Sequence, residues 1–140
     1  MSDSIFLTKE MLLETKDSLV IEEVKLLNSD GTTRGVVCVR EMTAKEKSVY
    51  EQSLTKRLPS IGQGKNRKQE EIVADIADVR VKLAICTVCD KNGVLLFSMD
   101  PPTIKALGNQ ISASNMERIA DVASRLNKLT EEAKEEEVKN

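Results

Sequence analysis

The chain has 140 residues and a net charge of −2, and 40% of its residues are hydrophobic against 31% that are charged. This length and balance are ordinary for one soluble globular domain, and the slight acidity predicts no strong attraction to nucleic acid or to an anionic membrane. There is no histidine and no tryptophan, so the chain lacks the commonest general base and metal ligand and has few aromatic rings for stacking bases. We expect neither an enzyme nor a cofactor, and no stretch approaches the ~20 apolar residues of a membrane span.

The first forty residues predict a short helix and then a β-hairpin. In the stretch TKEMLLETK, Thr8 is placed to cap a short helix. Residues 19–27 and 34–41 are rich in β-branched residues and flank Asn-Ser-Asp-Gly at 28–31, which is a strong turn signal. The opening residues lack the pattern of a signal peptide, so we expect a cytoplasmic protein whose three cysteines are reduced.

A second helix is predicted from Ala44, because Thr43 and Glu46 have the spacing of a capping box. Its apolar stripe consists of residues that lie four positions apart: Tyr50, Leu54 and Leu58. Pro59 is expected to end this helix. Residues 59–69 contain two glycines, a proline and three basic residues, which is typical of a mobile loop.

A long central helix is predicted from Glu70. Its buried face is marked by apolar residues at alternating spacings of four and three: Ile72, Ile76, Val79, Leu83 and Cys86. The second half, VKLAICTVC, is apolar on nearly every side and should be the most buried part of the protein. Two interpretations stay open for residues 84–97: a helix that ends in a C-cap and turn at Asn92-Gly93, or a β-hairpin.

Two further helices are predicted in the last third of the chain. The sequence Asp-Pro-Pro at 100–102 begins a short helix that should end at Gly108. Either Ser112 or Ser114 caps the next helix, which carries an amphipathic stripe. This stripe consists of Met116, Ile119 or Ala120, Ala123 and Leu126.

Together these elements predict an α+β fold. An N-terminal β-hairpin is followed by a mainly α-helical core with one long central helix and an amphipathic C-terminal helix. Residues 1–130 are expected to form a single globular domain that includes the mobile loop at 59–69. Residues 131–140 contain five acids and should be a frayed helix or a disordered tail.

The motif Cys86-x-x-Cys89 raises the question of a metal or redox site. A structural zinc site needs about four ligands, and this chain adds only Cys38 and no histidine to the pair. A redox pair normally lies exposed at a helix N-terminus, whereas this pair follows an apolar helical segment. We therefore predict buried, unreactive thiols and no metal.

Three other chemical motifs are weaker still. The Asp-Lys-Asn-Gly stretch at 90–93 does not begin a calcium loop, because Leu95 and Pro101 stand where that loop needs a glycine and a carboxylate. Gly-Gln-Gly-Lys at 62–65 lacks the earlier glycine and the following hydroxyl residue of a phosphate loop. The basic residues around this loop are more typical of a solvated surface than of a phosphate-binding site: Lys56, Arg57, Lys65, Arg67 and Lys68.

Five segments follow one another between about Leu7 and Glu132: FLTKEMLL, IEEVKL, VCVREMTAKEK, VRVKLAICTVCDKNGVLLF and IKALGNQISASNMERIADVASRLNKLTEE. Their order resembles that in the tail assembly chaperones of long-tailed bacteriophages and prophages. The Gly-Lys-Asn-Arg-Lys loop near 62–68 and the Met-Asp-Pro-Pro stretch at 99–102 depart from the family pattern.

The resemblance implies a non-catalytic chaperone that acts in the cytoplasm of a bacterial host. Such proteins bind the tape-measure protein, a very long helical chain that aggregates until the tail tube encloses it. They recruit tail-tube subunits and are not retained in the mature virion. Amphipathic helices on a soluble acidic protein suit this task, because they can cover the apolar stripes of a helical client.

The residues that would contact the client are harder to assign. Met116, Ile119 and Leu126 are our candidate partner-binding residues, and the same positions are also expected in the core because so small a chain needs them there. A homo-oligomer is compatible with a coating protein. Two other function classes stay open: a minor structural protein of the virion, and a small nucleic-acid-associated regulator that uses the basic loop.

Overall fold

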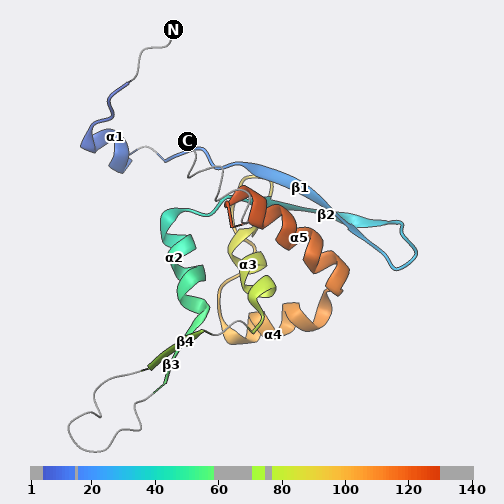
Figure 1. The fold of residues 1–140 in the computed structure, drawn as a ribbon. Coiled ribbons are helices and arrows are strands. Elements are labelled where there is room, and N and C mark those ends of the chain that lie inside the picture. The colour runs from blue at the N-terminus through green and yellow to red at the C-terminus, as the bar shows by residue number, and fades with distance from the viewer. Residues whose placement is uncertain (1–4, 15, 59–70, 75–76, 130–140) are drawn as a thin grey trace, which may run out of the picture.

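The computed structural model describes residues 5–14, 16–58, 71–74 and 77–129. In these residues the chain is α+β, as predicted. Strands β1 (Ile21–Leu27) and β2 (Thr33–Arg40) form an antiparallel hairpin, and the two-residue strand β5 (Val88–Cys89) pairs with the other edge of β2. Helices α2 to α5 gather on one side of this hairpin, and α1 stands apart from them (Figure 1).

The hairpin confirms the turn predicted at Asn-Ser-Asp-Gly. Gly31 adopts a left-handed φ of 89° and donates its N–H to the carbonyl oxygen of Asn28 at 3.0 Å. Along β1 the side chains of Val24 and Leu26 are buried, while those of Glu23 and Lys25 are exposed. This alternation places one face of the sheet against the helices.

Helix α1 (Lys9–Glu14) begins as predicted, because the Thr8 hydroxyl accepts a hydrogen bond from the N–H of Met11 at 3.2 Å. None of its residues is buried. The helix therefore gains little stability from packing on the described part of the chain, although short helices normally depend on such packing.

Helix α2 (Ala44–Ser53) confirms the capping box but ends earlier than predicted. The Thr43 hydroxyl accepts from the N–H of Glu46, and the Glu46 carboxylate accepts from the N–H of Thr43. The next residues form strand β3 (Thr55–Leu58), so Leu58 does not extend the helical stripe. The i, i+4 spacing was misleading here, because pairing with a distant strand satisfies the backbone of this segment instead.

That distant strand is β4 (Glu71–Ala74), which overturns the prediction of a helix from Glu70. Thr55 lies opposite Ala74, and Leu58 lies opposite Glu71 in this antiparallel pair. Ile72 is therefore a strand residue, and Ile76 and the predicted loop at 59–69 lie outside the described residues. Periodicity within one segment cannot reveal pairing between two segments that are separated along the chain.

The central helix α3 is short, spanning Val79–Thr87, and it is the most buried part of the described chain, as predicted. Every residue from Val81 to Cys89 is buried. The helix ends at Thr87 and passes into β5, which pairs with Cys38 and Val39 of β2. Residues 84–97 thus combine the two interpretations, a helix followed by an extended segment and a tight turn.

The predicted helix C-cap at Asn92-Gly93 was wrong, since the cap residue is Val88. The turn itself is present. Gly93 has a left-handed φ of 85° and donates its N–H to the carbonyl of Asp90 at 3.0 Å, after which Leu95 bridges back to Cys89.

Helices α4 (Pro101–Gln110) and α5 (Ala113–Leu126) complete the helical layer. Asp100 caps α4 through the N–H of Thr103, and the helix continues past Gly108, where it was predicted to end. Ser112, one of the two predicted candidates, caps α5. The predicted stripe of α5 faces the core: Met116, Ile119, Ala120 and Ala123 are buried and Leu126 packs against them.

Two asparagine side chains attach α5 to the sheet. Asn115 accepts a hydrogen bond from the N–H of Leu27 at 2.9 Å and donates one to the carbonyl of Leu27 at 3.0 Å. At the other end, Asn127 accepts from the N–H of Met42 at 2.7 Å and donates to the carbonyl of Ala123 at 2.9 Å. Backbone groups that the hairpin leaves without a partner are thereby satisfied.

Within the part of the chain that the structure describes, every helix is too short or too polar to cross a membrane.

We predict that Asn115→Ala lowers the free energy of unfolding by about 2 kcal/mol, because it leaves both backbone groups of Leu27 without this partner in a partly buried place. Urea denaturation followed by circular dichroism measures the effect. Ser114→Ala, an exposed neighbour on the same helix, is the matched control and should change stability by less than about 0.5 kcal/mol. Equal losses in the two variants would contradict the role given to Asn115.

Candidate functional site

The cysteines do not form a common site. Cys86 lies in the core on α3, and burial raises the pKa of its thiol to about 11. Cys89 is also buried, and the pKa of its thiol is raised by burial and secondarily by Cys38, its directly opposite residue in the sheet. All three thiols are free. Burial and a raised pKa make the thiols of Cys86 and Cys89 weak nucleophiles, in agreement with the burial predicted for this pair.

Metal-binding side chains are not brought together in the described residues. No group of three or more histidine, cysteine, aspartate or glutamate side chains there is placed to hold an ion. The carboxylate of Asp90 accepts hydrogen bonds from the backbone N–H groups of Asn92 and Val94 at 2.8 and 3.0 Å. It therefore closes a tight turn, as its neighbours in the sequence suggest.

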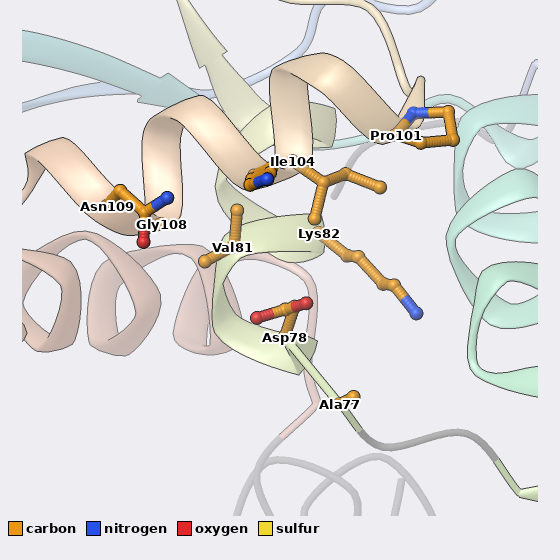
Figure 2. Close-up of a pocket in the computed structure, with 9 residues that line it drawn as sticks. Ala77, Asp78, Val81, Lys82, Pro101, Ile104, Gly108 and Asn109 are labelled. Atoms are coloured by element: carbon orange, nitrogen blue, oxygen red, sulfur yellow. The ribbon is translucent and has the colours of Figure 1, made fainter.

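An opening of about 470 Å³ lies between the first turn of α3 and one side of α4. Figure 2 shows Asp78 and Val81 on one wall, with the side chain of Lys82 directed away from Asp78 toward α2. Lys82 donates a hydrogen bond to the carbonyl oxygen of Ser53 at 2.7 Å, so it holds the end of α2. The described lining includes no thiol or hydroxyl side chain.

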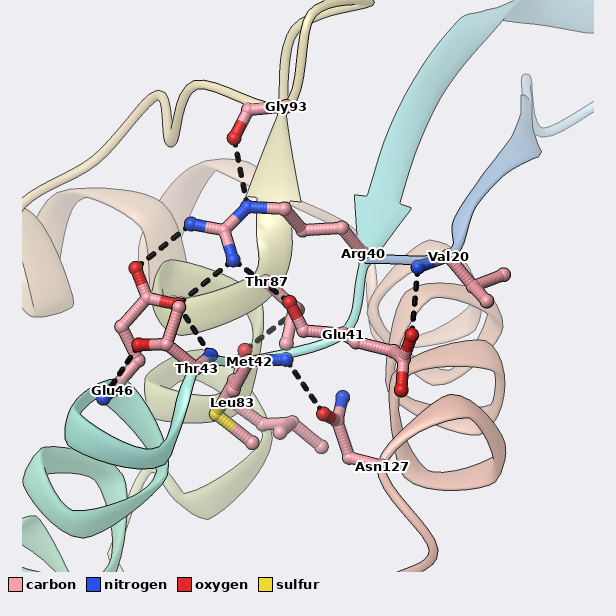
Figure 3. Close-up of polar contacts among 10 residues, drawn as sticks. All are labelled: Val20, Arg40, Glu41, Met42, Thr43, Glu46, Leu83, Thr87, Gly93 and Asn127. Atoms are coloured by element: carbon pink, nitrogen blue, oxygen red, sulfur yellow. Dashed lines mark hydrogen bonds and ion pairs between the residues drawn. The ribbon is translucent and has the colours of Figure 1, made fainter. Parts of the chain in front are cut away.

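The main polar cluster surrounds Arg40 at the end of β2 (Figure 3). The Arg40 guanidinium donates two parallel hydrogen bonds to the Glu46 carboxylate, each 2.8 Å long. It also donates to the carbonyl oxygens of Gly93 and Glu41 at 2.8 and 2.7 Å. The Arg40 side chain is buried. Its charge is compensated by the Glu46 carboxylate of α2 and by carbonyl oxygens at the end of β2 and in the turn after β5.

The Arg40 cluster lowers the pKa of Glu46 to about 2, chiefly through the hydrogen bonds from Arg40. The same bonds raise the pKa of Arg40. Both groups stay charged at neutral pH, and their hydrogen bonds join β2, α2 and the turn after β5. Sequence analysis assigned Glu46 to the capping box but missed Arg40, whose partners lie 6 and 53 positions away along the chain.

The candidate partner-binding residues are placed in the interior. Met116 and Ile119 are 5% and 3% exposed, and Leu126 packs at the edge of the core. This is the arrangement expected from the core interpretation of α5. A direct contact between these three side chains and a client stays a prediction.

Exposed apolar side chains are concentrated instead in residues 5–14, which we call the N-terminal segment. Six of its ten residues are large and apolar and between 47% and 91% exposed: Ile5, Phe6, Leu7, Met11, Leu12 and Leu13. Sequence analysis predicted the helix but could not predict that its apolar side chains would be exposed. A run of this kind usually marks a surface that binds another protein.

A shallow apolar groove lies on the helical body, between β2, the segment after β5, and α4. Its floor is formed by core residues, including Leu26, Ala84 and Ile119, and its walls include Val36, Leu96, Phe97 and Leu107. The groove continues along α4 past Ala106 and Thr103. The N-terminal segment and this apolar groove are the features of the described structure best suited to binding a protein.

Comparison with known proteins gave no match: no family model, no curated protein and no solved structure is similar to this chain.

We predict that Cys86 is alkylated far more slowly than a free thiol. A pKa of about 11 instead of 9 lowers the thiolate fraction at pH 8 by roughly 100-fold, and burial slows the reaction further. Timed iodoacetamide labelling with peptide mass spectrometry measures each cysteine separately, and partly exposed Cys38 should be labelled first. Rapid labelling of Cys86 in the folded protein would contradict its placement in the core, and labelling in urea is the control.

We predict that Glu46→Gln destabilises the protein by about 2 kcal/mol at pH 7, because Arg40 keeps its buried charge and loses its anionic partner. The folded pKa of Glu46 lies below its ordinary value of 4.5, so its contribution is complete above about pH 5 and is lost as the pH falls toward 2.

The measurement is the free energy of unfolding of both proteins between pH 2.5 and pH 7. The difference between them should shrink as the pH falls. Glu51→Gln, an exposed acid on the same helix, is the matched control and should differ little from the wild type at any pH. A difference for Glu46→Gln that does not change with pH would contradict the ion pair.

Proposed function

We propose that this chain is a tail assembly chaperone of a long-tailed phage or prophage. In this role it binds the tape-measure protein, keeps it soluble and recruits tail-tube subunits, without catalysing a reaction. It acts in the cytoplasm of the bacterial host and leaves before the virion is complete. The proposal rests on the order of sequence segments that resembles this family.

One structural observation supports a binding role in particular. The described body buries a well-packed core, yet the N-terminal segment carries six large apolar side chains that the body does not cover. Exposed apolar side chains that are grouped in this way are typical of a surface that binds another protein. A long helical client offers apolar stripes that these side chains can cover.

The physical mechanism is shielding by many weak contacts. Each copy covers a short length of the client, and several copies along one chain raise the effective affinity without any single strong contact. Few aromatic residues are available to anchor a tight interface, so single copies can be displaced as tube subunits polymerise around the client.

The test is co-expression of this chain with the tape-measure protein encoded in the same genome. We expect the soluble fraction of the tape-measure protein to rise and the two proteins to co-purify. A tape-measure protein that stays insoluble and does not co-purify would overturn the proposal. Mass spectrometry of purified virions separates this role from that of a minor structural protein, which would be present in the particles.

Because α5 forms part of the core, the predicted client contact near the C-terminus cannot be tested by removing this helix. A chain that stops after Leu129 keeps every described element and removes residues 130–140, five of which are acidic. Loss of co-purification in this variant would assign the contact to the tail. Retention would assign it to the body or to the N-terminal segment.

A further inference from the structure

Although the three cysteines do not share one site, two of them are direct neighbours in the sheet. Cys38 of β2 lies opposite Cys89 of β5 in the antiparallel register. Residues that lie opposite each other in such a pair have Cα atoms about 4.5–5.5 Å apart, and disulfides join Cα atoms about 4.4–6.8 Å apart. The backbone therefore already holds these two residues at a separation that a disulfide can bridge.

Both side chains lie on the face of the sheet that is turned away from the helices. Val37 and Val39, the neighbours of Cys38 along β2, pack in the core, so Cys38 points to the opposite face. Cys89 shares that face, because its neighbour Val88 is a core residue and because opposite residues of paired strands point the same way. A bond between the two sulfur atoms therefore needs no rearrangement of the helical core.

The two thiols differ in their access to solvent. Cys38 is partly exposed, whereas Cys89 is only 2% exposed. The turn after β5 lies over this face of the sheet: the Gly93 carbonyl accepts a hydrogen bond from Arg40, and a Cβ atom at Gly93 would lie 3.3 Å from the Cδ1 atom of Ile21 (Figure 3). A small oxidant in solution therefore reaches Cys38 first.

A positive charge lies close to the pair. Burial raises the pKa of the Cys89 thiol and Cys38 raises it further, while the Arg40 guanidinium acts in the opposite direction. Arg40 is two residues from Cys38 along β2, so the two side chains lie on the same face of the sheet. Arg40 thus favours the thiolate of Cys89, which is the form that attacks a second sulfur atom.

We propose that Cys38 and Cys89 form a reversible oxidation site, at which a peroxide or a small disulfide converts the two thiols into one cross-strand disulfide. The proposal concerns a modification of the chain and does not depend on the function proposed above.

With hydrogen peroxide the reaction has two steps. The Cys38 thiolate attacks one peroxide oxygen, the O–O bond breaks, and a sulfenic acid and hydroxide are formed. The Cys89 thiolate then attacks the sulfenic sulfur, so that the S–S bond forms, the S–O bond breaks and a second hydroxide leaves. The two hydroxides take up the two thiol protons as water, and the two electrons lost by the thiols reduce the peroxide.

With a small disulfide such as oxidised glutathione, the same thiols act in the same order. The Cys38 thiolate displaces one half of the reagent and forms a mixed disulfide, and the Cys89 thiolate then displaces the other half. Cys89 is a weak nucleophile, but it is held beside its target, and such placement raises the effective concentration of a reacting group by several orders of magnitude.

The structure disfavours the pair that the Cys-x-x-Cys motif suggests. Cys86 belongs to the hydrophobic core cluster on α3, whereas Cys89 points to the outer face of the sheet. The two thiols are thus directed to different sides of β5, although they are only three positions apart in the sequence. Cys38, which is distant in the sequence, is the better placed partner.

The disulfide would connect two strands that meet only briefly. Strand β5 has two residues, and its pairing with β2 joins α3 to the sheet. Val37 of β2 and Val88 of β5 line the apolar groove. Oxidation therefore fixes two walls of this groove relative to each other.

The experiment treats the folded, reduced protein with hydrogen peroxide and, separately, with oxidised glutathione. We expect the intact mass to fall by two hydrogen atoms and to recover with dithiothreitol. After tryptic digestion, GVVCVR (35–40) should be joined to LAICTVCDK (83–91). Fragmentation between Cys86 and Cys89 in the second peptide locates the bond without any substitution.

Three variants test the assignment, and circular dichroism checks that each is folded. Cys38→Ser and Cys89→Ser should abolish the internal disulfide. Cys86→Ala is the matched control and should form it at the rate of the wild type. Because the bond closes the chain between residues 38 and 89, the oxidised wild type should melt roughly 5–15 °C above the reduced protein.

Four results would overturn the proposal: oxidation that stops at a sulfenic or sulfinic acid on Cys38, a bond between Cys86 and Cys89 in the folded protein, a bond between two copies through Cys38, or an oxidised protein that melts below the reduced one. Oxidation in urea is the control, and there the three thiols should pair without this preference. None of these results involves the tape-measure protein, so this test and the co-expression test can fail independently.

Discussion

The fold depends on the burial of α3, a helix of nine residues whose last seven, Val81 to Thr87, are all buried. No single neighbour can surround a helix, so α2, α4, α5 and the sheet each cover a part of it (Figure 1). This constraint explains why so small a chain needs several separate elements. It also explains why the side chain of Lys82, a buried residue of α3, extends to the end of α2, where its ammonium group donates a hydrogen bond to the carbonyl oxygen of Ser53.

Polar side chains connect the elements that burial brings together. Arg40 joins the sheet to α2 and to the turn after β5, while Asn115 and Asn127 hold the two ends of α5. Each of these groups completes hydrogen bonds that the regular elements leave open, so the elements fit in one arrangement only. The N-terminal segment takes no part in these hydrogen bonds.

Local features were predictable from the sequence because their causes are local. The hairpin turn at Gly31, the capping box at Thr43 and the caps at Asp100 and Ser112 each depend on residues within four positions. The β3–β4 pair was missed because its partners are not neighbours in the chain. The exposed apolar surfaces were missed for a similar reason, because an apolar helix is buried only if other elements of the fold pack against it.

The β3–β4 pair determines where the chain can accept insertions and deletions during evolution. Thr55 and Ala74 lie opposite each other, so the chain leaves and re-enters the body at one place (Figure 1). The body therefore sets no particular length for the connection between these strands, because each doubling of loop length adds only about 0.6 kcal/mol to the free energy of closing it. This is the point at which the gene can gain or lose codons, or accept a foreign sequence, while the helices and their core remain as they are.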